Sequence, residues 1–357
     1  MRKHNFNAGP AALPLGVLEQ AQRDLVTFPG AGMSLLEMSH RSKAFEAVLR
    51  SAGEALGALY GLPDTHEVLF LQGGASLQFA QVPLNLGPGG GYLTTGEWSQ
   101  KALAEAKVID SAHELWSGKE GRFRGTPPAD QVFDGTRGPG ALTYLHYCSN
   151  ETIHGVQFQH VPQTPAPLVA ALSSDFISRP MDLSRYALVY AGAQKNAGPA
   201  GVTVVIGRKD VLRGYAGSER TPKILRYATQ ANNESMYNTP PTFAIYLVGL
   251  VAKWALDEGG LEAIAARNAR KARRLYDVID GGGRFQGHAA PEARSHMNVT
   301  FTTGDEATDA RFVAEAEKQG FVGLKGHRAV GGLRASIYNA VPEESVEALT
   351  ALMSRFD

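Results

Sequence analysis

Short apolar segments that alternate with helical segments limit the folds open to this chain more than any other feature. Residues 44–59 repeat apolar side chains at three- and four-residue steps, which is typical of an amphipathic helix. Continuous apolar runs are typical of parallel strands that are buried on both faces of a sheet. The sequence therefore predicts an α/β fold with a mostly parallel sheet covered by helices. The predicted strands span residues 68–71, 92–95, 142–148, 168–173, 187–190 and 202–206.

The C-terminal part of the chain predicts a second, smaller unit. Gly259-Gly260 ends one helical pattern, and a second follows at 261–279. Three glycines at 281–283 then read as a linker. We expect an N-terminal segment, a large domain and a small C-terminal domain at residues 1–15, 16–258 and 259–357. The other elements predicted here are helix 243–257, strand 297–302, helix 310–318, strand 333–338 and helix 343–355.

Charge, cysteine content and hydropathy exclude several function classes. Lys and Arg together number 35, as do Asp and Glu, and no basic stripe typical of nucleic-acid binders is present. The single cysteine, Cys148, excludes an intramolecular disulfide and a cysteine-based zinc cluster. The apolar stretch 243–256 is too short to span a membrane and contains Lys253. Because the N-terminus lacks the apolar region of a secretory signal, we expect a cytoplasmic protein. Together, these features predict a protein that binds no metal, nucleic acid or membrane.

One lysine stands in a setting that favours chemistry. Lys195 follows a predicted strand that ends in small residues, and a Gly198-Pro199 turn comes after it. The small neighbours leave room for a flat ligand. Partial desolvation there lowers the pKa of the amine and frees it as a nucleophile, as Schiff-base formation with an aldehyde cofactor requires. Taken alone, the segment favours a surface lysine on a loop, and only further residues shift the balance.

Two further segments follow predicted strands, at the sheet edge where α/β proteins bind ligands. Asp175 comes after strand 168–173, where a carboxylate can hold the nitrogen of a ring cofactor protonated. A turn or helix cap is an equally frequent use of such an aspartate. Gly73-Gly74-Ala75-Ser76 joins a strand to a helix, so backbone N–H groups and the Ser76 hydroxyl can bind an anion. This turn matches neither a Walker loop nor a dinucleotide fingerprint.

Two side chains complete the candidate site. Trp98 lies at a strand-to-helix junction, where its indole can stack on a planar cofactor or anchor the helix in the core. Thr152 follows strand 142–148 and can bond a ring substituent or cap a turn. Each residue alone is weak evidence, and the combination favours a cofactor site.

With these pieces assembled, the sequence resembles the phosphoserine aminotransferases, class V members of the fold-type I pyridoxal-phosphate enzymes. The resemblance covers nearly the whole chain, with the motifs in family order. The segments around Lys195 and at 326–339 are the most specific to this family. The other matching segments are Asn5 to Pro10, Ser39 to Ser42, Gln72 to Phe79, Val82 to Asn85, Ser149 to Thr152 and Tyr237 to Pro241.

The resemblance implies a seven-stranded large-domain sheet, pyridoxal 5′-phosphate as cofactor, and a role for each site residue. Lys195 is expected to hold the cofactor as a Schiff base and to move the proton between substrate Cα and cofactor C4′. Asp175 is expected at the pyridine nitrogen and Trp98 against the ring. The other expected contacts are Thr152 at the 3′-oxygen side, Ala75, Ser76 and Gln194 at the phosphate, and Asn238 and Thr239 at the phosphate of the neighbouring subunit's cofactor. A homodimer with shared active sites is therefore implied.

The resemblance also implies how substrates bind. Arg334 is expected at the substrate α-carboxylate, because a planar guanidinium suits a bidentate carboxylate. A cationic pocket for the substrate phosphate, or for the γ-carboxylate of glutamate, is expected from His40, Arg41, His327 and Arg328, the first two from the partner chain. Solvated surface cations are the alternative, against which two separate His-Arg pairs argue. Ser76 stands where some family members carry arginine, so phosphate binding rests on these pairs.

The implied reaction is transamination between L-glutamate and 3-phosphohydroxypyruvate, giving O-phospho-L-serine and 2-oxoglutarate with ping-pong kinetics. Roles in serine and pyridoxine biosynthesis are implied by the family alone. An alanine–glyoxylate aminotransferase would not need two His-Arg pairs. A cysteine desulfurase would need a cysteine on a mobile loop, whereas Cys148 lies in an apolar run. A binding protein without catalysis would have lost the lysine, whereas Lys195 is present together with the surrounding family motif.

Overall fold

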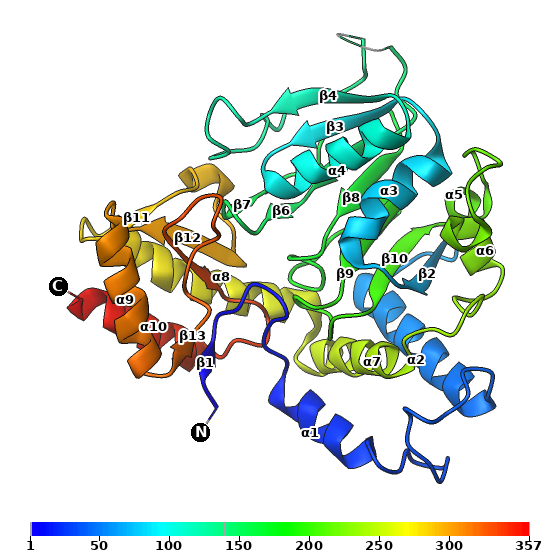
Figure 1. The fold of residues 1–357 in the computed structure, drawn as a ribbon, viewed down its shortest axis with the longest axis horizontal. Helices are drawn as coiled ribbons and strands as arrows, with labels where there is room; N and C mark the ends of the chain where they lie inside the picture. Colours follow the sequence, from blue (N-terminus) through cyan, green and yellow to red (C-terminus); the bar gives the residue numbers. More distant parts are fainter. Residues whose placement is uncertain (1, 137, 139, 357) are drawn as a thin grey trace.

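A seven-stranded sheet forms the centre of the molecule (Figure 1). The computed structural model describes residues 2–136, 138 and 140–356, so Met1 and Asp357, at the outer ends of the predicted segment 1–15 and domain 259–357, lie outside the described residues. Neighbouring strands are parallel except β10, which is antiparallel to both β2 and β9. The predicted mostly parallel sheet is confirmed. Its order is β2 (His66–Leu71), β10 (Thr203–Arg208), β9 (Leu188–Gly192), β8 (Leu168–Ala171), β5 (Leu145–Cys148), β3 (Gly90–Thr94) and β4 (Ala112–Ser117).

Each predicted apolar run forms a strand of this sheet, with ends shifted by a few residues. Strand β4 was not predicted. It lies at the edge of the sheet, and its side chains are half-buried or exposed, so no apolar run marks it in the sequence.

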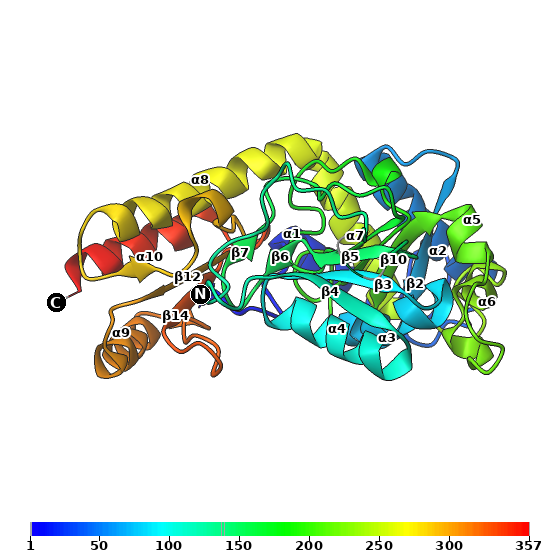
Figure 2. The same ribbon diagram turned by 90° about the horizontal axis from the view of Figure 1, so that it is seen from above.

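Helices cover both faces of the sheet. Leu69 and Leu71 of β2 face helices α3 (Gly74–Leu86) and α4 (Glu97–Ile109). Phe70 between them faces α2 (Lys43–Tyr60) and α7 (Thr242–Asp257), because successive side chains of a strand point to opposite faces. The two helix pairs lie on opposite sides of the sheet (Figure 2). The other elements of this part are α1 (Leu15–Asp24), β6 (Asn150–Glu151), β7 (Val156–Gln157), η1 (Leu183–Arg185), α5 (Lys209–Arg213), η2 (Lys223–Leu225) and α6 (Tyr227–Ala231).

The C-terminal part has its own apolar core around a three-stranded antiparallel sheet, and lies beside the large sheet (Figure 1). Residues near the N-terminus join it, because Phe6 is buried in this core and β1 (His4–Asn5) pairs with β13 (Phe321–Val322). The elements of this part are α8 (Gly260–Asp280), β11 (Gln286–Gly287), η3 (Pro291–Ala293), β12 (Asn298–Thr302), α9 (Glu306–Lys318), β14 (Leu333–Ser336) and α10 (Glu343–Arg355).

Helix α8 connects the two parts. Its first turns contribute Leu261 and Ile264 to the core of the large sheet, and its last turns contribute Leu275 and Ile279 to the C-terminal core. Figure 2 shows this helix running from one part to the other. A division near residue 258 stays a prediction, which the separate C-terminal core supports. Within residues 2–136, 138 and 140–356, none of the helices combines the length and apolar character that a membrane span needs.

A buried lysine fastens α8 to the end of β14. Lys271 is fully buried, and its Nζ donates hydrogen bonds to the carbonyl oxygens of Ile337 (2.8 Å), Tyr338 (2.7 Å) and Val341 (3.2 Å). Burial lowers the pKa of this amine to about 7. Ile337, Tyr338 and Val341 are buried, so Lys271 satisfies carbonyls that lie away from the surface and closes the turn that follows β14.

We expect Lys271→Met to lower the free energy of unfolding by about 3 kcal/mol, because it leaves buried carbonyls without a donor. Urea denaturation measures this change. The control, Lys253→Met on the exposed side of α7, should change it by less than about 0.5 kcal/mol. Equal effects of the two variants would contradict the structural role of Lys271.

Candidate active site

A cavity of about 300 Å³ opens where parallel strands of the large sheet end at their carboxyl edge. Cys148 ends β5, Ala171 ends β8, and Lys195 follows β9, so three neighbouring strands contribute to the cavity. This size lies at the lower end of the range for small-molecule sites. The lining residues are Gly73, Gly74, Ala75, Ser76, Phe79, Trp98, Cys148, Asn150, Ala171, Ser173, Ser174, Gln194 and Lys195.

The N-terminus of α3 forms one wall of the cavity. Gly73 precedes the helix with a φ of +92°, and a Cβ there would lie 2.4 Å from Leu77 Cδ2. Only glycine fits this turn, which brings the backbone of Gly74, Ala75 and Ser76 to the cavity. The first N–H groups of a helix have no acceptor within it, so this wall suits an anion.

The neighbouring helix, α4, is held by a buried carboxylate. Glu151 accepts hydrogen bonds from Trp98 N (3.0 Å), Ser99 N (2.8 Å) and Ser99 Oγ (2.6 Å). Gly96 permits this approach, since a Cβ there would lie 2.6 Å from the carboxyl carbon of Glu151. Burial raises the pKa of Glu151, which the three donors oppose. The side chain of Trp98 is thereby positioned at the cavity.

Thr152 connects three side chains of the predicted site. Its Oγ1 accepts from Trp98 Nε1 (2.6 Å) and from Lys195 Nζ (3.2 Å), and its carbonyl accepts from Arg334 Nη1 (3.3 Å). Lys195 Nζ lies 5.4 Å from the centroid of the Trp98 ring. Lysine, indole and guanidinium are therefore gathered around one residue, although their positions span residues 98–334.

The amine of Lys195 is prepared to react. Burial in the cavity wall lowers its pKa to about 8, while the nearby carboxylate of Glu151 opposes this shift and Arg334 adds to it. A larger share of this amine than of an ordinary lysine is therefore neutral and nucleophilic near neutral pH. The lowered pKa expected from the sequence is present, and the role of Lys195 as the cofactor lysine stays a prediction.

Asp175 is fully buried but does not line the cavity. Strand β8 ends at Ala171, and Asp175 lies in the turn that follows, where its carboxylate forms an ion pair with Arg179 Nη2 (3.1 Å). Its assignment to the pyridine nitrogen stays a prediction, and these contacts do not support it.

The predicted substrate residues fall into two groups. Arg334 lies against Thr152, and the pKa of His327 is lowered by burial and by the neighbouring Arg334 and Arg328. Arg334, His327 and Arg328 belong to one side of the site. His40 is half-buried and Arg41 exposed, in the loop before α2. The predicted phosphate residues Asn238 and Thr239 are exposed, and Asn238 lines a second cavity together with Gln72 and Gly73.

Several residues of the site were not predicted. Glu151 was noted only as part of a motif, although an acid directly after an apolar strand is a signal for a buried contact. Phe79, Asn150, Ser173 and Ser174 line the cavity because the strand ends and α3 converge in space, which no local pattern indicates. Cys148 lines it too, and burial raises its pKa well above the usual value, so it is a neutral thiol.

The sequence matches the model of the family "Aminotransferase class-V" over residues 3–349. It is 52% identical to the phosphoserine aminotransferase of Geobacillus kaustophilus, with 99% of this chain and 98% of the relative covered. The chain is a class-V aminotransferase of the phosphoserine aminotransferase family. Another relative, the phosphoserine aminotransferase of Bacillus subtilis, is 48% identical over 99% of this chain and 98% of its own length.

Solved structures of this aminotransferase family share the fold. The phosphoserine aminotransferase from Bacillus circulans subsp. alkalophilus superposes with a TM-score of 0.95 at 49% identity, over 99% of this chain and 98% of that one. A pyridoxal-phosphate-bound phosphoserine aminotransferase from Trichomonas vaginalis gives 0.90 at 40% identity, over 99% and 100%. The family and fold expected from the sequence motifs are confirmed.

The lowered pKa of Lys195 leads to a test on the ligand-free aminotransferase. We expect its modification by an amine reagent such as trinitrobenzenesulfonate to rise with pH around a midpoint of about 8, because only the neutral amine reacts. Peptide mapping by mass spectrometry measures the extent at each residue. Lys107, which is exposed on α4 and lies outside the cavity lining, is the internal control. A shared midpoint for both lysines would refute the desolvation of Lys195.

Proposed function

We propose that this aminotransferase transfers the amino group of L-glutamate to 3-phosphohydroxypyruvate, giving O-phospho-L-serine and 2-oxoglutarate, as a phosphoserine transaminase. The observation that carries this proposal is the position of Thr152, which brings Trp98, Lys195 and Arg334 together beside a helix N-terminus. A nucleophilic amine, a flat aromatic face, a carboxylate binder and an anion site are the parts that such a reaction needs.

The cavity fits pyridoxal 5′-phosphate. The first turn of α3, with Ala75 and Ser76, would hold the phosphate together with Gln194, and Trp98 would lie against the ring. Thr152 Oγ1 would donate or accept at the 3′-oxygen side, since its hydroxyl does both. When bound, the cofactor supplies an aldehyde carbon for amines and a conjugated ring that takes up electrons released at the substrate Cα.

Lys195 has two tasks in this proposal. Its amine would hold the cofactor through the aldehyde carbon while no substrate is present, and the lowered pKa keeps it nucleophilic. Once freed by a substrate amine, Nζ would accept and pass on the proton released at the substrate Cα. The hydrogen bond to Thr152 Oγ1 keeps Nζ at the cavity for this transfer.

Cationic side chains recognise the substrates. Arg334 binds the α-carboxylate common to both amino acids. Its Nε is buried without a partner among the residues that the structure describes, which supports a ligand contact. His327 and Arg328 bind the phosphate or the γ-carboxylate. A second copy of the chain contributes His40 and Arg41 to this pocket, and Asn238 and Thr239 to the cofactor phosphate. The exposure of Arg41, Asn238 and Thr239 in the single chain supports a homodimer with shared active sites.

The place of this reaction in the cell is also part of the proposal. O-phospho-L-serine leads to serine biosynthesis, and the names of the relatives support this role. The proposal also includes a cytoplasmic location. It further includes a second keto-acid substrate, from pyridoxine biosynthesis, that would use the same site.

Absorbance spectra of the purified protein test the cofactor assignment. We expect a band from bound pyridoxal phosphate that Lys195→Ala abolishes, together with a loss of transamination of at least about 100-fold, because the proton carrier is missing. The control Lys107→Ala should keep both. Should the wild-type protein remain colourless after incubation with pyridoxal phosphate, the proposed function is wrong.

Two arginine variants test the substrate assignment. Arg334→Gln should lower kcat/KM about 100-fold for both 3-phosphohydroxypyruvate and pyruvate, because it removes a buried charged partner of the α-carboxylate. Arg328→Gln should lower only the value for 3-phosphohydroxypyruvate, by about tenfold. Surface residue Arg50, which pairs with Glu54, supplies the control Arg50→Gln. A wild-type preference for pyruvate would speak against the phosphate pocket.

A further inference from the structure

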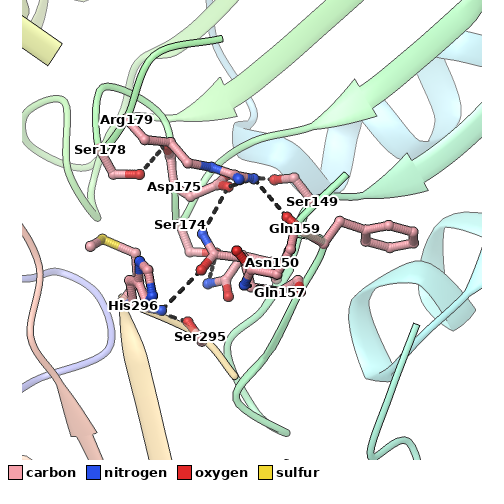
Figure 3. A network of polar contacts seen from close by, with 12 residues as sticks. Ser149, Asn150, Gln157, Gln159, Ser174, Asp175, Ser178, Arg179, Ser295 and His296 are labelled. Atoms are coloured by element: carbon pink, nitrogen blue, oxygen red, sulfur yellow. Dashed lines mark hydrogen bonds and ion pairs between the residues drawn. The ribbon is translucent and has the colours of Figure 1, made fainter. Parts of the chain in front are cut away.

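The carboxylate of Asp175 has its hydrogen-bonding capacity taken up by the protein. One oxygen accepts from Ser149 Oγ, and the other accepts from Gln157 Nε2 (3.2 Å) and Arg179 Nη2 (3.1 Å). Figure 3 shows the carboxylate held among these side chains. A buried anion with a cation and two further donors is compensated where it lies and has no need of a ligand.

These contacts lead away from the cavity. Gln157, which donates to Asp175, accepts from the backbone N of His296 (2.9 Å), in the segment before β12. Arg179 also donates to the carbonyl oxygen of Phe158 (2.9 Å). Asp175 therefore ties the turn after β8 to β7 and to the C-terminal part of the chain, as Figure 3 shows with His296 and Ser295 at the far end.

The part of the cavity wall at the ends of β5 and β8 is uncharged. Cys148 and Ala171 face each other in the register of β5 and β8, and both line the cavity. Among the described residues of the lining, Lys195 is the only charged one. The Cys148 thiol is neutral because burial raises its pKa, so it supplies no anion. Glu151, the other buried carboxylate nearby, caps α4 and does not line the cavity.

A pyridine nitrogen bound in this cavity would meet no carboxylate among the described lining residues. The ring nitrogen of pyridoxal phosphate lies across the ring from the aldehyde carbon, so Lys195 and the nitrogen are on opposite sides of the ring. Burial without a neighbouring anion disfavours a charged pyridinium, whereas a carboxylate in contact stabilises it. The uncharged wall therefore favours the neutral form of the ring.

We infer that the bound cofactor of this chain keeps an unprotonated ring nitrogen against a wall that includes Ala171 and Cys148, and that Asp175 is a positioning residue of the protein. This inference rests on the proposed function, because it requires pyridoxal phosphate in the cavity. A neutral ring is a weaker electron sink, so the chemistry depends more strongly on proton transfer by Lys195.

Nuclear magnetic resonance of bound pyridoxal phosphate, isotope-labelled at the ring nitrogen, tests the inference directly. We expect the wild-type signal at the position of an unprotonated pyridine. Ala171→Asp, which puts a carboxylate into the wall, should move it toward the protonated position, and the similarly sized Ala171→Asn should not. Asp175→Asn should leave the signal in place and lower the Tm, because it weakens the pair with Arg179.

The outcomes separate the two proposals. A protonated signal in the wild-type protein that is lost in Asp175→Asn would overturn the inference and assign Asp175 to the ring nitrogen. A protonated wild-type signal that survives in Asp175→Asn would overturn it as well. The wild-type spectrum decides even if a variant fails to fold. A protein that retains no pyridoxal phosphate after gel filtration would instead overturn the proposed function, and the inference with it.

Discussion

The contact of the Glu151 carboxylate with the first turn of α4 is the interaction on which the site depends. A buried carboxylate is costly unless donors surround it, and here two backbone N–H groups and the Ser99 hydroxyl do so at the positive end of a helix. The contact fixes α4 to the segment after β5. Trp98 itself donates to Glu151, and Thr152 follows Glu151 in the sequence. The hydrogen bond between Trp98 and Thr152 therefore follows from this contact.

Thr152 forms hydrogen bonds with residues of both parts of the molecule. Lys195 comes from the large sheet and Arg334 from β14 of the C-terminal part, and both bond to Thr152. Asp175 makes a second connection through Gln157 to the segment before β12. Polar contacts that include these two therefore hold the C-terminal part relative to the cavity, in addition to the apolar packing of α8.

Much of the fold was predictable because its strands are buried on both faces. Their apolar runs stand out in the sequence, and the predicted helices at 44–59, 243–257 and 261–279 appear as α2, α7 and α8. The edge strand β4 escaped prediction because half-exposed side chains produce no such run. Glu151 escaped because its function is to bind a helix terminus more than fifty residues earlier in the chain, a contact without a local pattern.

The sequence by itself determined the family and the lysine: Lys195 follows a strand, small residues surround it, and the motifs stand in family order. Only the tertiary structure decided which neighbouring side chains reach the cavity. Asp175 follows the end of β8 by four residues of turn, and over that distance the direction of a side chain depends on the turn and its partners. Ala171, at the strand end itself, lines the cavity instead. Proximity in sequence to a strand end brings a residue near the site, but packing decides the side to which its charge points.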